Sequence, residues 1–456
     1  MSLSASNLGQ ELRLQLRLAL PIAFIQVGML MMGVVDMLVC GRLEDEAARR
    51  LAVGAVSLGH SFTFLPLMFG MGILMVLDPL VSQALGARDQ DAVERAVHRS
   101  VPLTLLVSLP ALLAVLFARP LMQFFAQPEE LIPIAVDYAW SILPGVPFFL
   151  GFIVLRQPLQ AQHRLRPLIV VILIANLLNL GLNLILVQGH LGAPALGALG
   201  SGIATSIVRV ALFLLLAYFA RHQLGVPLWP LRRDALSLRS ALALFWQGLP
   251  IGLQMLLEGG AFHAIALMMG WFGKNVLSAH MVTLQYAALS FMLPLGISQA
   301  AAVRVGYELG AGRFDQMRRA AWLACALGMA VMSVAAILFW LIPENLAWYM
   351  TPDQAIVAIA VQLLPIAAAF QIVDGLQVVA TGALRGAGDL RVAMLLHLLG
   401  FWALGVPFGW WLAFREPFAL GPPGLWIGLA AAIFATALFM LLRLRSVLNR
   451  CCTPTR

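Results

Sequence analysis

Acidic residues inside long apolar stretches are the first feature of this sequence that could do chemistry. The stretches contain Asp36, Asp78, Glu258 and Asp374. An ionised carboxylate in the middle of a membrane-spanning helix costs roughly 2.5–3.5 kcal/mol, so such residues usually mark ion or proton pathways. The alternative is a protonated acid that only joins helices by a hydrogen bond. We favour the pathway role for Asp36, Glu258 and Asp374. Asp78 lies near the end of a predicted helix, where it can reach water, and for it we favour a structural role.

Amide and hydroxyl side chains accompany the first of these acids. Asn179 and Asn183 lie four residues apart in one apolar stretch, so they share a helix face, and Thr205 lies in the next stretch. Burial favours the neutral form of a carboxyl group, which can load H⁺ on one side of a membrane and release it on the other. The same oxygens could instead coordinate Na⁺, and both ions stay open, with Na⁺ placed at the carboxyl groups of Asp36, Glu258 and Asp374. The predicted cation-coupling and substrate-binding set is Asp36, Asn179, Asn183, Thr205, Glu258 and Asp374.

No other residue pattern points to a reaction. The sequence has no Gly-x-x-x-x-Gly-Lys-Ser/Thr motif, so we expect no ATP hydrolysis, no enzymatic activity and no cofactor. The histidines and the four cysteines show no metal-ligand spacing. His263 lies five residues after Glu258, but we predict a packed, hydrogen-bonded residue rather than a part of the site.

The composition predicts a membrane protein. Of the 456 residues, 61% are hydrophobic and 11% charged, and the mean hydropathy is +0.91. A soluble chain of this length could not hide so much apolar surface, whereas each membrane-spanning helix uses roughly 20 such residues. We therefore predict an all-α integral membrane protein. Its twelve helices are predicted at residues 18–40, 51–82, 97–118, 131–155, 167–188, 195–220, 241–272, 276–303, 320–342, 355–384, 392–413 and 423–443.

The positions of the basic residues predict an orientation rather than a nucleic-acid partner. The net charge is +8, from 28 arginines and the single lysine Lys274 against 21 acids. Twenty-two of the 29 basic residues fall at the termini or in the loops after even-numbered helices, six fall on the opposite side, and Arg209 lies inside a predicted helix. Since cytoplasmic loops carry the excess of Lys and Arg, we predict a multi-pass membrane protein with both termini in the cytoplasm.

The two halves of the sequence resemble each other at a nearly fixed offset. Gly-Ala-Arg at 86–88 recurs as Gly-Ala-Gly at 310–312, 224 residues later, and Asp36 has Glu258 as its near-counterpart, 222 residues later. An offset of six helices gives both halves the same orientation in the membrane, with substrate sites between or within them. We predict an N-terminal six-helix lobe over 1–220, a cytosolic linker over 221–240 and a C-terminal six-helix lobe with a cytosolic tail over 241–456.

Four segments resemble the multidrug and toxic compound extrusion (MATE) family, specifically its NorM-like bacterial branch. They are Gly33 to Asp36 with Gly41, Pro250 to Glu258, Ser278 to His280 with Arg304 to Gly306, and Asp374 to Gln377 with Gly382 to Asp389. The last segment is the most specific, and the similarity covers nearly the whole chain.

This resemblance implies a protein of the bacterial inner (plasma) membrane, with two six-helix lobes that form a V. It also implies export of organic cations such as fluoroquinolones and dyes in exchange for H⁺ or Na⁺ by alternating access. It implies coupling or binding roles for the six site residues above, Glu258 and Asp374 in the C-terminal lobe and the others in the N-terminal lobe. We expect a monomer whose partners are small organic cations, H⁺ or Na⁺ and membrane lipid.

Some positions depart from the family pattern. Phe370 stands where some relatives have a coordinating tyrosine, and Met281 and Gln285 stand where the eighth helix often has Gln and Asn. The loss of those oxygens favours H⁺ over Na⁺. The alternative function is a lipid-linked oligosaccharide flippase of the same superfamily, but such proteins add helices and basic cavity residues. Here Arg209 is the only base placed away from the ends of a predicted helix. A passive channel or scaffold would not explain acids in both lobes.

Overall fold

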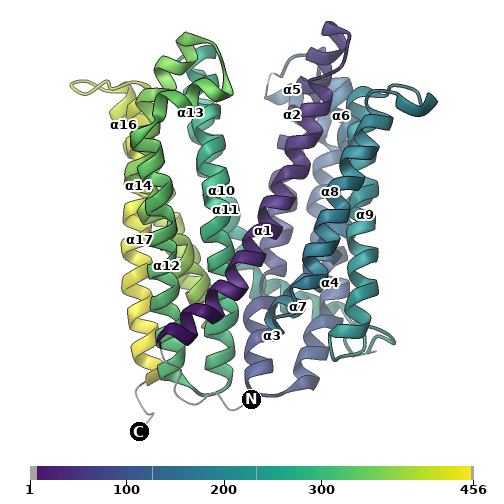
Figure 1. Cartoon of the computed structure of the whole chain (residues 1–456), viewed down its shortest axis with the longest axis vertical. Coiled ribbons are helices and arrows are strands. Elements are labelled where there is room, and N and C mark those ends of the chain that lie inside the picture. Colours follow the sequence, from purple (N-terminus) through teal and green to yellow (C-terminus); the bar gives the residue numbers. More distant parts are fainter. Residues whose placement is uncertain (1–7, 126, 233, 453–456) are drawn as a thin grey trace. The chain divides into compact units, whose positions relative to one another are not determined.

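The structure is helical throughout the part of the chain that it describes (Figure 1). The computed structural model describes residues 8–125, 127–232 and 234–452, and these residues contain no strand. Twelve of its segments are long and apolar enough to cross a membrane, and they confirm the twelve predicted spans. Several, such as 8–40 and 46–86, extend beyond the predicted run, because an apolar run marks only the part of a helix that lies in hydrocarbon.

Each span is one helix or a pair of helices joined end to end. They are α1 (Leu8–Cys40), α2 (Glu46–Leu74) with α3 (Leu77–Gly86), α4 (Gln90–Leu116), α6 (Ile132–Ile142) with α7 (Val146–Ala161), α8 (Arg166–Leu186), α9 (Gly197–Gln223), α10 (Leu238–Gly270), α11 (Lys274–Gly310), α12 (Phe314–Leu341), α14 (Gln354–Gly386), α15 (Leu390–His397) with α16 (Val406–Phe414), and α17 (Pro422–Cys452).

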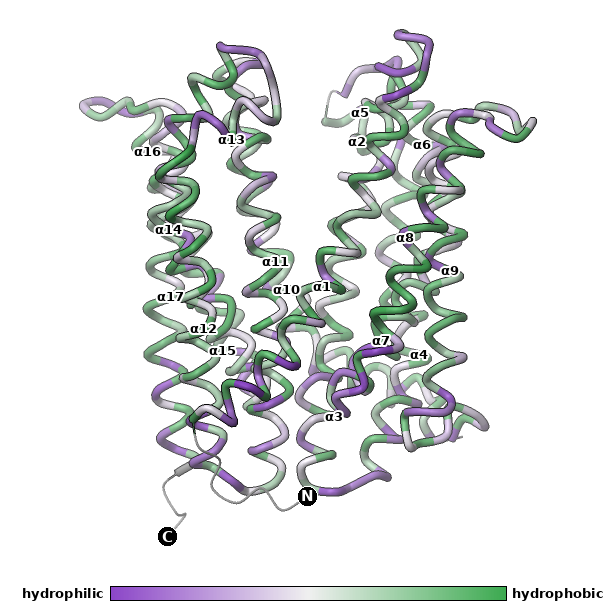
Figure 2. Tube along the Cα trace, viewed as in Figure 1, coloured by the Kyte–Doolittle hydropathy of each residue, from purple (hydrophilic) through white to green (hydrophobic). Residues whose placement is uncertain are grey.

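Shorter elements connect the spans. The 3₁₀ turn η1 (Leu143–Gly145) joins α6 to α7, and the π-helix η3 (Leu398–Gly405) joins α15 to α16. The helices α5 (Ala118–Phe124) and α13 (Pro343–Met350) and the turn η2 (His190–Gly192) lie between spans. Figure 2 shows hydrophobic residues along the middle of the long helices and hydrophilic residues gathered towards their ends.

The internal repeat is visible in the turns that end four helices. After α11, Gly312 has φ 69° and donates to Leu309 O at 3.0 Å, while the next amide donates to Glu308 O at 2.9 Å. This pair of bonds caps the carbonyls of the last helical turn and requires a left-handed residue, which glycine adopts most readily. The same pair of bonds follows α14, with Gly388 at φ 80°, and α7, with His163 at φ 60°. At the end of α3, Arg88 occupies the left-handed position at φ 61°. The recurring turns lie 224 and 225 residues apart, as the sequence offset predicts.

The helices form two compact units. Unit 1 contains the described residues of Met1–Ala23, Ser82–Arg88 and Leu253–Arg456, and unit 2 those of Phe24–Val81 and Asp89–Gly252. The helix α1 is therefore shared: its first part belongs to unit 1 and its remainder, with Asp36, to unit 2. The predicted linker 221–240 lies within unit 2, and the division into lobes at this linker stays a prediction.

Glycines allow helices within a unit to approach closely. In unit 1, a Cβ atom on Gly328 of α12 would lie 2.9 Å from Gly375 O of α14, and one on Gly375 would lie 2.8 Å from Gly328 O. In unit 2, a Cβ on Gly59 of α2 would lie 2.9 Å from Ala135 O of α6. Small residues at helix contacts are what packing in lipid requires, because burial against lipid tails gives helices no hydrophobic reason to associate.

The segment between α9 and α10 is fastened to α4 by His98. The ring Nδ1 accepts from the backbone N–H of Arg232 at 3.2 Å, so Nε2 carries the proton and donates to Pro227 O at 2.7 Å. The Arg232 side chain pairs with Asp91 of α4 and with Asp234, where its hydrogen bond lowers the pKa of the exposed Asp234 carboxyl. These bonds hold the segment against the first turns of α4.

Four charged side chains of unit 1 form a buried chain. Arg304 of α11 donates through Nε and Nη2 to the two carboxylate oxygens of Glu11 in α1, at 3.0 and 2.7 Å. Its Nη2 also lies 2.9 Å from Glu308 Oε1, and Arg313 Nε lies 2.7 Å from Glu308 Oε2. The side chains of Glu11, Arg304 and Glu308 are at most 3% exposed. Removing one partner of such a pair leaves a buried charge without compensation.

We therefore expect Arg304→Gln to lower the free energy of unfolding by roughly 3–5 kcal/mol, because Glu11 and Glu308 lose their shared cation. Denaturant unfolding of the detergent-solubilised protein measures the change. Arg318→Gln, at an exposed position of α12, is the matched control and should change it by less than about 0.5 kcal/mol. Equal stability of Arg304→Gln and the wild type would contradict the importance of this chain.

Candidate functional site

Asp36 of α1 is surrounded by hydrogen-bond donors from two other helices of unit 2. Asn179 and Asn183 of α8 donate through Nδ2 to Asp36 Oδ1 at 2.9 and 2.8 Å, and the Thr205 hydroxyl of α9 donates to Oδ2 at 3.0 Å. Asp36 is 6% exposed and both asparagines are at most 1% exposed. The structure thus brings together all four residues that the sequence predicts for the first half of the chain. We call these residues the Asp36 site.

The donors of the Asp36 site suit an ionised carboxylate, which accepts hydrogen bonds but cannot donate one. The Oδ1 atoms of Asn179 and Asn183 are buried without a partner among the described residues. A proton on Oδ2 of Asp36 would turn that oxygen into a donor, and the Thr205 hydroxyl, which can accept as well as donate, could then reverse its hydrogen bond. Loading a proton would therefore change the hydrogen bond that joins α1 to α9, while Oδ1 can still accept from both asparagines. Carboxylate and amide oxygens could also take a small cation.

A basic residue lies beside the Asp36 site. Arg209 follows Thr205 by four residues on α9, so the two share a helix face, and it is near enough to act electrostatically on Asp36. Its Cζ lies 5.3 Å from the centroid of the Phe149 ring, within cation–π distance. Tyr138 of α6 is near enough to interact electrostatically with both Asp36 and Arg209. The sequence predicts Arg209 as a base inside a helix but does not reveal that it lies beside Asp36, because that depends on how α1 packs on α9.

The acids of the second half lie together in unit 1. Glu258 of α10 and Asp374 of α14 are near enough to act on each other electrostatically. The Glu258 side chain is 20% exposed, whereas Asp374 is 6% exposed. Glu258 Oε2 lies 3.7 Å from Nε2 of His397, a fully buried residue of α15. We call Glu258, Asp374 and His397, together with Gln377, the Glu258 site.

The hydrogen bonds of His397 fix which of its nitrogens carries a proton. Nδ1 lies 3.0 Å from Ala393 O, which can only accept, so Nδ1 is protonated. In the neutral ring Nε2 is then an acceptor, and the amide nitrogens of Gln377 and Gln254 lie 2.9 and 3.5 Å from it. The Nε2 atom of His397 therefore links α15 to Gln254 of α10 and Gln377 of α14, and the same atom faces Glu258.

Sequence reasoning missed most of these neighbours. Gln377 follows Asp374 by three residues in the tenth-helix motif, so helical periodicity could have placed it on the same face. His397 carries no such signal beyond being an ionisable residue in an apolar run. His263, predicted to be packed and hydrogen-bonded, does bond to Gly259 O at 2.8 Å, but it is exposed. The prediction that it is packed is therefore wrong.

Asp78 also differs from its prediction. It lies in the first turn of α3 and is only 2% exposed, so the expectation that it reaches water is wrong. The charge that acts on it electrostatically is Arg156 of α7, also 2% exposed, which donates to Gln26 Oε1 at 3.0 Å. Two opposite charges on neighbouring elements can stay buried together because each compensates the other.

The departures from the family pattern keep oxygens away from the Glu258 site. Phe370, one turn before Asp374, is buried and stacks on Trp426 with ring centroids 6.0 Å apart. Met281 and Gln285 of α11 are exposed. Within the described ranges, no group of three or more His, Cys, Asp or Glu residues is arranged to hold a metal ion.

Twelve apolar spans with carboxyl groups buried between them define a multi-pass membrane protein of the transporter class. A model of the MatE family matches residues 21–185 and 250–411, which is more than half of the chain. The chain therefore belongs to this family, the MATE transporters.

Individual relatives agree over nearly the full length. The chain is 34% identical to the "Probable multidrug resistance protein NorM" of Bradyrhizobium diazoefficiens over 98% of this chain and 95% of that protein. It is 37% identical to the protein of the same name from Rhodopseudomonas palustris over 95% and 91%. Among solved structures, the eukaryotic MATE transporter AtDTX14 has the same fold, with a TM-score of 0.87 and 20% identity over 97% of this chain and 99% of that one.

A double-mutant cycle tests the hydrogen bonds of the Asp36 site. Asp36→Ala and Asn183→Ala should be non-additive in the free energy of unfolding by roughly 0.5–3 kcal/mol, because the two side chains bond to each other. Asn176→Ala is the matched control, since Asn176 lies on the same helix but donates to Gly28 O. Its effect should add to that of Asp36→Ala. Additive effects for Asn183 would show that the bond to Asp36 is not formed.

Proposed function

We propose that the protein is a secondary-active multidrug efflux antiporter that exports organic cations in exchange for H⁺ by alternating access. The observation that carries the proposal is the Asp36 site, a buried carboxyl group held by three donors from two other helices. Its relatives are named multidrug resistance proteins, which supports efflux of drugs. Fluoroquinolone-like and dye-like cations are the expected substrates, and the exporting machinery comprises the Asp36 site in unit 2 and the Glu258 site in unit 1.

Exchange follows from the charge of the sites. A carboxylate attracts an organic cation when it is ionised and loses that attraction when it is protonated, so proton and drug compete for the same negative charge. Glu258 is the more exposed of the two acids in its site, so we expect a cation to reach it before Asp374. Inward flow of protons can then drive outward movement of the drug, provided that the two are not bound together.

The environment of Asp36 favours H⁺ over Na⁺ as the coupling ion there. A sodium ion needs several oxygen ligands, whereas both oxygens of Asp36 are already engaged with three donors. A proton binds to one carboxyl oxygen and needs no further ligand. In the Glu258 site, Phe370 provides no oxygen where a tyrosine would. Both features therefore support H⁺, with Na⁺ as the alternative.

A lipid-linked oligosaccharide flippase remains the second candidate, and Arg209 is the observation that favours it, since a buried cation suits a phosphate-bearing substrate. Arg385 of α14 also acts electrostatically on Glu258, so each site has one base beside it. The three acids, Asp36, Glu258 and Asp374, still outnumber these two bases and favour a cationic cargo. Reconstituted flipping of a lipid-linked sugar, together with an absence of dye export, would decide for the flippase.

Dye efflux from proteoliposomes tests the role of the carboxyl groups. We expect Asp36→Asn, Glu258→Gln and Asp374→Asn each to reduce efflux under an inward proton gradient to near the rate of liposomes without protein. Glu344→Gln is the matched control, because Glu344 is an exposed acid of α13 and its variant should transport at the wild-type rate. Wild-type efflux by the three site variants would remove the basis of the proposal.

The coupling ion is tested separately with the wild-type protein. An imposed pH gradient should drive efflux without any Na⁺, and an imposed Na⁺ gradient at equal pH on both sides should not. Collapse of the pH gradient with a protonophore is the control and should stop transport. Efflux driven by Na⁺ alone would reverse the assignment of the ion while leaving antiport intact.

A further inference from the structure

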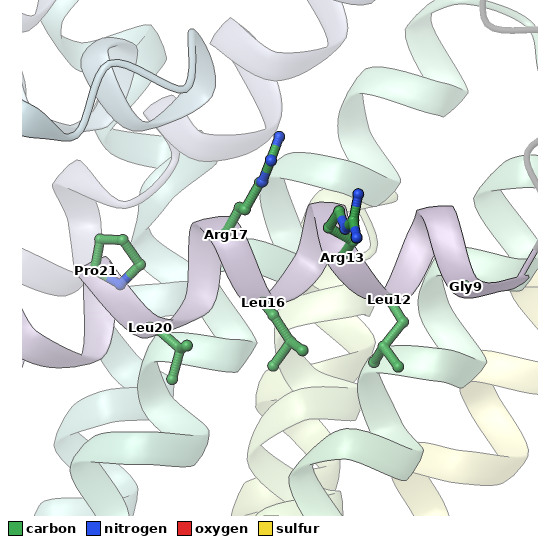
Figure 3. A pocket seen from close by; sticks show the side chains of 7 residues that line it. All are labelled: Gly9, Leu12, Arg13, Leu16, Arg17, Leu20 and Pro21. Carbon is green, nitrogen blue, oxygen red and sulfur yellow. The ribbon is translucent and has the colours of Figure 1, made fainter.

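The first part of α1, residues 8–21, has two faces of different character, and we call it the N-terminal arm. One face is buried in unit 1: Glu11 pairs with Arg304, and Gln15 Nε2 donates to Ala320 O at 2.7 Å. The other face is open and borders a shallow hollow of about 480 Å³ (Figure 3). The arm is thus held rigidly by one side while the opposite side remains available to a partner.

The open face carries two parallel stripes of side chains. Leu12, Leu16 and Leu20 are spaced four residues apart and form an apolar stripe, and Arg13 and Arg17 form a basic stripe beside it. Figure 3 shows the arginines extending towards one edge of this face and the leucines towards the other edge. Leu20 is 60% exposed, and both arginines are exposed and form no ion pair with any described residue.

Helix length and charge locate the arm at the membrane surface. The 33 residues of α1 measure about 50 Å at 1.5 Å per residue, whereas the hydrocarbon core is about 30 Å thick. Roughly 20 Å of helix is therefore left for the interface or for tilt. Two unpaired arginines cannot lie in hydrocarbon at acceptable cost, so the arm is the part that lies among the headgroups.

We propose that the N-terminal arm is a binding site for an anionic phospholipid. The lipid phosphate lies between the Arg13 and Arg17 guanidinium groups, which suit its oxygens, and an acyl chain covers Leu12, Leu16 and Leu20. A free phosphate would leave the leucines exposed to water, and an uncharged lipid would leave the arginines without a counter-ion. The inference does not depend on the proposed function, since it uses only the fold and the arm.

Native mass spectrometry of the full-length protein in detergent tests the site. The probes are phosphatidylglycerol, phosphatidylcholine with the same acyl chains, and soluble glycerol 3-phosphate. Phosphatidylglycerol should bind about 25-fold more tightly than phosphatidylcholine, as the product of a factor of about five from each arginine. Glycerol 3-phosphate should not displace it, because it lacks the acyl chains. Displacement by glycerol 3-phosphate would show a simple anion site and overturn the proposal.

Variants connect the binding to the arm. Arg13→Gln/Arg17→Gln should bind phosphatidylglycerol no better than phosphatidylcholine, and Arg13→Lys/Arg17→Lys should retain most of the preference. Arg318→Gln/Arg319→Gln removes two exposed arginines of α12 in the same unit and should bind as the wild type does. Wild-type preference in Arg13→Gln/Arg17→Gln, or an equal loss in the Arg318/Arg319 control, would overturn the proposal. Because all four arginines are exposed, each variant is expected to fold, which its unfolding temperature checks.

Discussion

The absence of water in the bilayer core is the constraint on which the rest of this structure depends. Without water, every backbone N–H and C=O must find a partner inside the protein, and the helix is the one open-ended element that provides them within its own segment. The same constraint acts on side chains, because a carboxylate or guanidinium that leaves water must be met by donors or by an opposite charge. Asp36 accepts hydrogen bonds from three donors, and Arg304 is paired with the carboxylates of Glu11 and Glu308. Both sets bring together side chains from different helices.

The sequence predicted the features that depend on periodicity alone. The spans follow from apolar runs, and the pairing of Asn179 with Asn183 on one face follows from their spacing of four. Asp36 could be grouped with them because few polar residues lie in the neighbouring runs and each must find a partner. Features that depend on how helices distant in the sequence pack together could not be predicted from the sequence. His397 faces Glu258 only because α15 packs beside α10 and α14, and Arg156 lies within a helix although the apolar pattern ends just before it.

The two sites surround their buried carboxyl groups with different kinds of side chain. The Asp36 site uses neutral amides and a hydroxyl, whose donors stabilise a negative charge without a cation in direct contact. The Glu258 site has a second acid and a histidine whose accepting nitrogen faces the carboxyl. Two acids near each other cannot both be ionised cheaply in an apolar surrounding. A repeated fold has thus kept equivalent turns at 310–312 and 86–88 while the side chains of its two sites have diverged.

The helix α1 connects these sets of polar residues along one element. Its arm is fixed in unit 1 by Glu11 and Gln15, and 25 residues beyond Glu11 the same helix carries Asp36 in unit 2. A change in the hydrogen bonds of Asp36 therefore acts on a helix whose other end is anchored by buried charges. Pro21 lies between the two attachments and removes one backbone hydrogen bond of the helix there, so the least resistant point of α1 lies where the units divide it. The attachment of α1 in unit 1 and its attachment in unit 2 are thus joined covalently through the segment that contains Pro21.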